Sequence, residues 1–140
     1  MDDAMKELGR RAIAAGFAWV PGCANQYGER VTRVVRHMNG ADIEAWDPRA
    51  FGWTSSESYI GGDDVPDLSD PATVGCLDAQ LAERFGCPVI VTPFGKMFRA
   101  WRMLPPDVDE FYYRLCAIRT ATTPAGAIVA ALDAAPKVAP

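Results

Sequence analysis

The segment VPDLSDPATVGCLDAQLAERFG, residues 65–86, contains the clearest structural signals in this sequence. Asp70 is a suitable N-cap, because its carboxylate can accept hydrogen bonds from the free amides of a first helical turn, and Pro71 fits the first helical position. Gly86 fits the left-handed conformation that ends many helices. Between them, apolar residues at steps of three and four form one stripe: Val74, Leu77, Leu81 and Phe85. We therefore predict a helix over 71–85 that lies across a sheet.

Two more helices are predicted near the ends of the chain. An acidic cap at Asp2 or Asp3 precedes a helical apolar pattern that Gly16 ends. Thr123 followed by Pro124 repeats the order of cap and proline before the last helical pattern. Three helices are therefore expected, each with one apolar face.

Strand patterns fill the segments between the helices. Asn39–Gly40 separates two of them and is a strong hairpin signal. Residues 110–119 fit either a strand or a helix, and their aromatic content favours a strand. A short strand near 57–60 is left open. The clearest strand patterns cover 17–22, 30–38, 41–46, 89–93 and 96–104.

These elements predict an α+β fold, an antiparallel sheet with helices packed on one face. The 140 residues have the size of a single domain, residues 1–140. No apolar run approaches the ~20 residues of a membrane-spanning helix, so no membrane association is expected. The N-terminus lacks the basic start and apolar stretch of a signal peptide, so we expect a cytoplasmic protein.

The charged residues are unevenly distributed along the chain. Residues 39–83 contain ten acids and one base, whereas the flanking regions are slightly basic and the whole chain has a net charge of −4. Three interpretations are open. The acids could neutralise the chain's own arginines, form a solvated surface, or bind a basic surface on another protein. Direct binding to duplex nucleic acid is disfavoured, because it requires a clustered basic field.

Candidate catalytic residues are few. His37 is the only histidine, and Cys23 is the only cysteine in a loop-like setting, so a Cys–His nucleophile would have to use this pair. Cys76, Cys87 and Cys116 fit buried free thiols. We expect Cys23 to be the most reactive thiol because of its loop-like context.

No motif for a metal or cofactor is found. Residues 61–70 hold four carboxylates, a density that suits a hard cation, but the spacing of an EF-hand loop is missing. One histidine and no close cysteine pair disfavour zinc. Phosphate-binding and hydrolase glycine motifs are also missing. The sequence therefore predicts no cofactor.

The segment PDLSDPATVGCL, residues 66–77, resembles a stretch found in small uncharacterised proteins encoded by bacteriophages and prophages. GFAWVPG (16–22) and GAIVAALDAAP (126–136) resemble the opening and the terminal helix of the same group. These patches are capping and core features and assign no catalytic residue. The resemblance implies a phage-type accessory protein that works inside a bacterial host.

The sequence thus favours a non-catalytic protein that acts by protein–protein interaction. Its acidic surface would occupy a basic surface on a host protein, such as a nucleic-acid-handling defence complex, as an anti-CRISPR inhibitor does. The alternative is a small enzyme or ligand-binding domain with residues 48–70 as a lid. The expected partner-binding residues combine acids with aromatic residues of the long connection: Asp63, Asp64, Asp67, Glu57, Trp53 and Tyr59.

Overall fold

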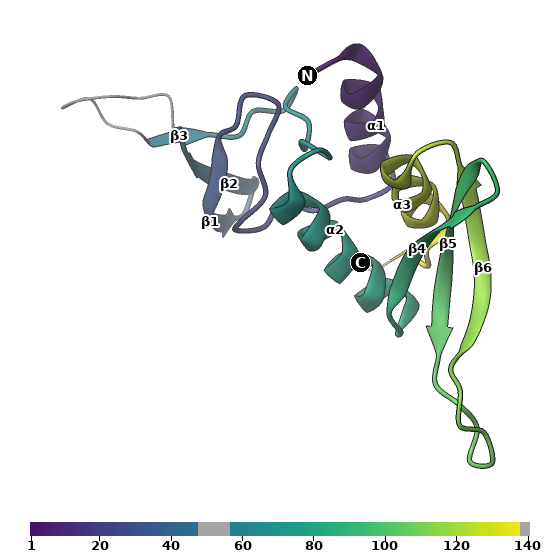
Figure 1. Cartoon of the computed structure of the whole chain (residues 1–140). Helices are drawn as coiled ribbons and strands as arrows, with labels where there is room; N and C mark the ends of the chain where they lie inside the picture. The colour runs from purple at the N-terminus through teal and green to yellow at the C-terminus, as the bar shows by residue number, and fades with distance from the viewer. Residues whose placement is uncertain (48–56, 138–140) are drawn as a thin grey trace. The chain divides into compact units, whose positions relative to one another are not determined.

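A computed structural model describes residues 1–47 and 57–137 of the chain, and the predicted α+β class is confirmed (Figure 1). The described residues form three helices and two antiparallel sheets of three strands each. The chain divides into two compact units. Met1–Ile13 and Ala18–Cys76 form the first unit, and Ala14–Phe17 and Leu77–Pro140 form the second. The expected single domain over 1–140 stays a prediction.

The first unit contains helix α1 (Asp3–Ala14) and the sheet β1–β2–β3, whose strands are Arg30–His37, Gly40–Trp46 and Glu57–Tyr59. The amide of Met5 donates to the Asp2 carboxylate at 2.8 Å, so Asp2 is the cap of α1. The predicted hairpin joins β1 and β2, and its turn is formed by residues 38 and 39. The short strand left open near 57–60 is also present.

Helix α1 contains a glycine in its middle, although glycine weakens helices, because the helix lies very close to another segment at that point. Gly9 is buried, and a Cβ atom on it would lie 2.8 Å from the Cβ of Val65. Real Cβ atoms do not approach so closely, so a larger residue would force the helix away from this segment. The close approach explains why glycine stands in the middle of a helix, where it costs ~1 kcal/mol relative to alanine.

Helix α2 (Pro71–Phe85) has the predicted bounds. The predicted cap, stop residue and apolar stripe are all present in the structure. Asp70 accepts hydrogen bonds from the amide and the hydroxyl of Thr73, at 2.9 Å and 2.7 Å. Gly86 has a φ of +70°, the left-handed conformation expected after the last turn. Leu77 and Leu81 are 1% and 0% exposed, which confirms the register of the apolar stripe.

The second unit contains the sheet β4–β5–β6, with strands Val89–Phe94, Met97–Leu104 and Arg114–Ala121, and helix α3 (Pro124–Ala134). Helix α3 packs on all three strands (Figure 1). Its cap is Thr123, as predicted, whose side chain accepts from the amide of Gly126. The second unit therefore has the predicted arrangement of a helix against an antiparallel sheet.

Two strand predictions need correction. Residues 17–20 form no strand, and the nearby chain has only two isolated bridges, which pair Ala24 with Arg30 and Asn25 with Pro66. The alternative of a strand in 110–119 is correct, but β6 begins only at Arg114. The aromatic residues that favoured the strand therefore precede it.

Candidate functional site

The three predicted aspartates have different surroundings. Asp63 is exposed and has no hydrogen bond or ion pair among the described residues. Asp64 is half-buried and accepts hydrogen bonds from the amide of Gly61 at 2.8 Å and from the side chains of Asn25 and Gln26 at 3.2 Å and 3.0 Å. Asp67 is half-buried and accepts from the amide of Ser69 at 3.0 Å. Two of the three acids therefore hold local structure.

The other predicted site residues are described only in part. Tyr59 is 63% exposed at the end of β3. Glu57 pairs with Trp46 through the β2–β3 ladder. Trp53 lies outside the described residues, as does the first part of the predicted lid, 48–56.

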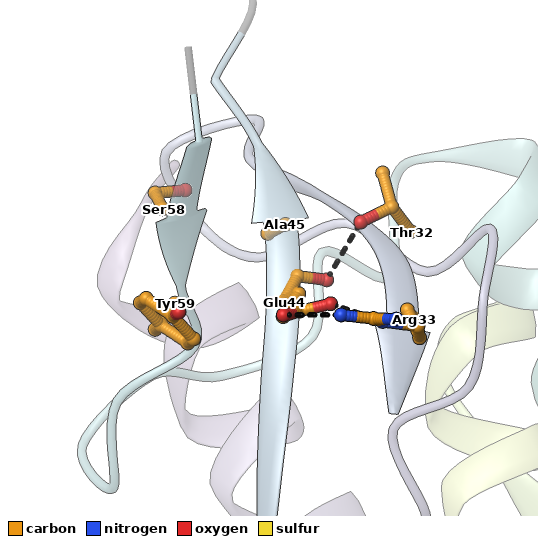
Figure 2. A pocket seen from close by; sticks show the side chains of 6 residues that line it. All are labelled: Thr32, Arg33, Glu44, Ala45, Ser58 and Tyr59. Atoms are coloured by element: carbon orange, nitrogen blue, oxygen red, sulfur yellow. Dashed lines mark hydrogen bonds and ion pairs between the residues drawn. The ribbon is translucent and has the colours of Figure 1, made fainter. Parts of the chain in front are cut away.

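Tyr59 lines a cavity of about 100 Å³ on the first sheet (Figure 2). Thr32, Arg33, Glu44, Ala45 and Ser58 complete its lining. The Oγ of Ser58 is buried and has no hydrogen-bond partner among the described residues. Sites for small organic ligands usually enclose ~300 Å³ or more. The cavity is therefore too small for such a ligand, although it has room for a few water molecules.

Asp63 and Asp64 line a second cavity, of about 170 Å³, with Arg10, Ile13, Gly62 and Val65. The predicted residues therefore do not form one site. Tyr59 belongs to the first cavity, and the two aspartates belong to the second.

Several acids of the first unit pair with the unit's own bases. Arg33 bonds to Glu44 across β1 and β2, with Nη2 2.9 Å from Oε1, and this pairing lowers the pKa of Glu44. His37 Nε2 lies 3.4 Å from Asp42 Oδ1 on the same two strands. His37 is exposed, and it has no hydrogen bond to a cysteine among the described residues. These contacts favour the interpretation that the acids neutralise the chain's own charges.

The strongest of these pairs joins β1 to the cap of α2. Arg30 donates to both oxygens of Asp70, each at 3.0 Å, and also to the carbonyl of Gly22 at 2.6 Å. The Arg30 hydrogen bonds are the main reason that the pKa of Asp70 falls to about 2. Because this carboxylate also caps the helix, one residue connects the first sheet to the start of α2.

The cysteines differ from the sequence-based expectation. Cys23 is fully buried, and burial raises the pKa of its thiol to about 12. Cys87 is buried as predicted, whereas Cys76 is half-buried and Cys116 is exposed. The expectation that Cys23 is the most reactive thiol is therefore wrong, because its loop is packed against the chain. Cys116 is the most accessible thiol.

An apolar surface covers one face of the β4–β5–β6 sheet. Residues directly opposite in an antiparallel pair share a face, and the register places a row of apolar and aromatic residues together. We call this the outer face: Ile90, Phe94, Met97, Arg99, Trp101, Met103, Leu115 and Ala117. Helix α3 packs on the opposite face, where its Gly126 approaches the Cβ of Ala121. Phe94 and Leu115 remain 45% and 48% exposed.

The centre of the outer face is ordered by stacking. The guanidinium of Arg99 lies 3.5 Å from the ring centroid of Phe94 and 5.4 Å from that of Trp101. Its Nε donates to Thr120 at 3.0 Å, and the indole of Trp101 donates to Thr92 at 2.9 Å. These contacts hold large flat side chains in fixed positions at low entropic cost.

The connection between β5 and β6 adds to the apolar surface and extends beyond the strand ends (Figure 1). Val108 is 103% exposed, Phe111 94%, Tyr112 82% and Tyr113 58%. Arg114 lies 3.7 Å from Asp107 and 3.9 Å from Glu110. Two acids of this connection therefore pair with Arg114 at the start of β6, whereas its apolar side chains remain exposed.

Sequence reasoning assigned the aromatic residues 111–113 to a strand, and it missed their exposure. One signal was available: Pro105, Pro106 and three acids precede them, which is typical of a connection rather than a strand. The outer face was also detectable, because 96–104 places apolar residues on both of its alternating faces.

Two classes of site find no support within the described residues. They contain no group of three or more histidine, cysteine, aspartate or glutamate side chains that could hold a metal ion. None of their helices is long and apolar enough to cross a membrane.

Comparison with known proteins gives no match. No family model, no curated protein and no solved structure is similar to this chain. The functional proposal therefore rests on the residues and their geometry.

Proposed function

We propose that this protein acts by binding another protein, and that the outer face and residues 105–113 make the contact. The observation that carries the proposal is the exposure of Phe111 and Tyr112, 94% and 82%, in the connection between two strands of a sheet that has an apolar face. Aromatic side chains supply most of the energy of protein interfaces, and exposed apolar patches of this kind mark interaction sites.

The edge of the sheet supports the same proposal. Among the described strands, β6 has a neighbour on one side only, so its other edge has backbone donors and acceptors available to an extended partner segment. The register of β5 and β6 shifts at Ile118, so β6 contains a bulge that limits pairing with a long flat strand. A specific partner that follows this bend therefore fits better than unspecific strand addition.

The class of partner is proposed from the sequence. A phage-type accessory protein that inhibits a host nucleic-acid-handling complex, as anti-CRISPR proteins do, would meet a basic surface. Asp63 and Tyr59 are exposed and could take part in that contact, whereas Asp64 and Asp67 bond within the chain. The acids would mainly accelerate the encounter through long-range attraction, and the apolar surface would supply affinity.

A pull-down from bacterial lysate tests this proposal. The bait is the full chain, compared with a double variant, Phe111→Ser with Tyr112→Ser. Met38→Ser is the matched control, because Met38 is 101% exposed at the hairpin tip of the first sheet. We expect the double variant to retain at most about a tenth of the partner that wild type captures, since each lost anchor costs ~1.4 kcal/mol or more. Equal capture by all three baits would contradict the proposal.

A further inference from the structure

The thiols of Cys23 and Cys76 lie together in the first unit. Cys23 is fully buried and Cys76 is half-buried on α2, and, after burial, the neighbouring Cys76 side chain contributes to the raised pKa of the Cys23 thiol. The Sγ of Cys76 lies 3.9 Å from the carbonyl oxygen of Pro21 and 3.8 Å from the position a Cβ on Gly22 would take. Cys76 therefore packs against the residues that immediately precede Cys23.

The backbone fixes Cys23 in this position. Its amide donates to the carbonyl of Val20 at 3.2 Å, and its carbonyl accepts from the amide of Val31 at 2.8 Å. The next amide, that of Ala24, donates to the hydroxyl of Thr73 at 2.8 Å. Thr73 and Cys76 are on the same helix. Hydrogen bonds that connect this helix to Pro21 and Ala24, on either side of Cys23 in the sequence, therefore hold the two cysteines near one another.

We infer that peroxide joins Cys23 and Cys76 in a disulfide, which makes the pair an oxidation site of this protein. Cys76 is the more accessible thiol and attacks the peroxide first. Its sulfur displaces hydroxide, which takes up a proton to leave as water, and a sulfenic acid forms. Cys23 then attacks that sulfur, its own proton leaves with the hydroxyl as a second water molecule, and the S–S bond forms. Hydrogen peroxide is the oxidant and is fully reduced.

The different surroundings of the two thiols suit these two roles. Burial keeps Cys23 protonated, so it does not react with oxidants from solution, but it lies beside the sulfur that does. Cys87 and Cys116 belong to the second unit, so neither shares a unit with this pair. The disulfide would close a loop from residue 23 to residue 76 that contains the whole β1–β2–β3 sheet.

The test treats the full-length protein with hydrogen peroxide and maps its peptides without reduction. We expect a peptide pair that links Cys23 to Cys76, reversed by dithiothreitol. The oxidised protein should melt roughly 5–10 °C higher, because the bond restricts a long loop of the unfolded chain. Cys116→Ser is the matched control and should leave the bond unchanged.

Cys23→Ser adds a second readout, in which Cys76 accumulates as a sulfenic acid that dimedone traps. In wild type the same trap should capture much less, because Cys23 removes the intermediate. Two results would overturn the inference. One is a peroxide-treated wild type in which Cys76 is a sulfinic acid and Cys23 is still a free thiol. The other is a disulfide that forms only between Cys116 residues of different molecules.

Discussion

On the β1–β2–β3 sheet, Arg33 lies opposite Glu44, and His37 lies close to Asp42, so charged side chains on neighbouring strands neutralise one another. On the β4–β5–β6 sheet, the face turned away from α3 carries Phe94 and Trp101, stacked around one arginine. Both sheets have three antiparallel strands. They differ in the side chains of one face: on the first sheet these form charge pairs with one another, whereas on the second many are apolar and exposed.

This difference shows why net charge is a poor guide to a binding surface. The acidic segment is prominent in the sequence, yet in the structure several of its carboxylates already hold a helix cap, a turn or a cross-strand pair. An apolar side chain has no comparable way to be satisfied while it remains in water. The second unit therefore leaves apolar side chains exposed to water, among them Phe111 and Tyr112.

The largest effect is expected in the core of the second unit. Leu81→Ala removes a side chain that is 0% exposed, and it should lower the free energy of unfolding by about 2–5 kcal/mol. Glu83→Ala on the exposed side of α2 is the control and should change it by less than about 0.5 kcal/mol. Urea denaturation measures both. An unchanged midpoint for Leu81→Ala would mean that the apolar stripe is not the core.

The next largest loss of stability is expected when a half-buried carboxylate of the first unit is neutralised. Asp70→Asn removes the ion pair with Arg30 and should cost about 2 kcal/mol at neutral pH. The pKa of Asp70 lies below its unfolded value of 3.8, so the stabilisation is complete above pH 4 and is lost as the pH falls toward 2. Denaturation at pH 7 and at pH 2 should show a difference between variant and wild type only at pH 7. The same difference at both values would assign the cost to helix capping alone.

Two neighbouring acids allow a finer test of which carboxylates are satisfied within the chain. Asp64→Asn disturbs hydrogen bonds from Gly61, Asn25 and Gln26 and should cost about 1 kcal/mol of stability. Asp63→Asn should cost almost nothing, because its side chain has no partner among the described residues. Thermal melting distinguishes them. If Asp63→Asn melts earlier than Asp64→Asn, the assignment of the two roles is wrong.

A substitution on the outer face should also have only a small effect on stability. Leu115→Ser replaces a side chain that is 48% exposed and should cost less than about 1 kcal/mol, measured by the same denaturation. A loss as large as that of Leu81→Ala would show that the outer face belongs to a core and is not a binding surface.

Local signals in the sequence predicted the helices well. The Asp70 and Thr123 caps, the Gly86 stop and the stripe through Leu81 act within one or two turns, so the sequence alone specifies them. The pairing of Arg30 with Asp70 and of Cys23 with Cys76 could not be predicted. These residues are 40 and 53 positions apart, and only the folded sheet brings them together.

The outer face of the β4–β5–β6 sheet shows the same limit. Alternation in a strand shows which residues share a face, but it does not show which face a helix covers. In β5 both faces are apolar, so the covered face, with Ala100 fully buried, could be identified only from the structure. The bulge at Ile118 also shifts which residues of β6 share a face. Nothing in the sequence marks the position of this bulge.

Site-specific photo-crosslinking tests the binding surface most directly. A benzophenone side chain replaces Tyr112 in one variant and Met38 in another, two residues that are 82% and 101% exposed on different sheets. After illumination in bacterial lysate, we predict one discrete crosslinked product from position 112 and none from position 38. A product from position 38 with none from position 112 would contradict the assignment of the binding surface to the second unit.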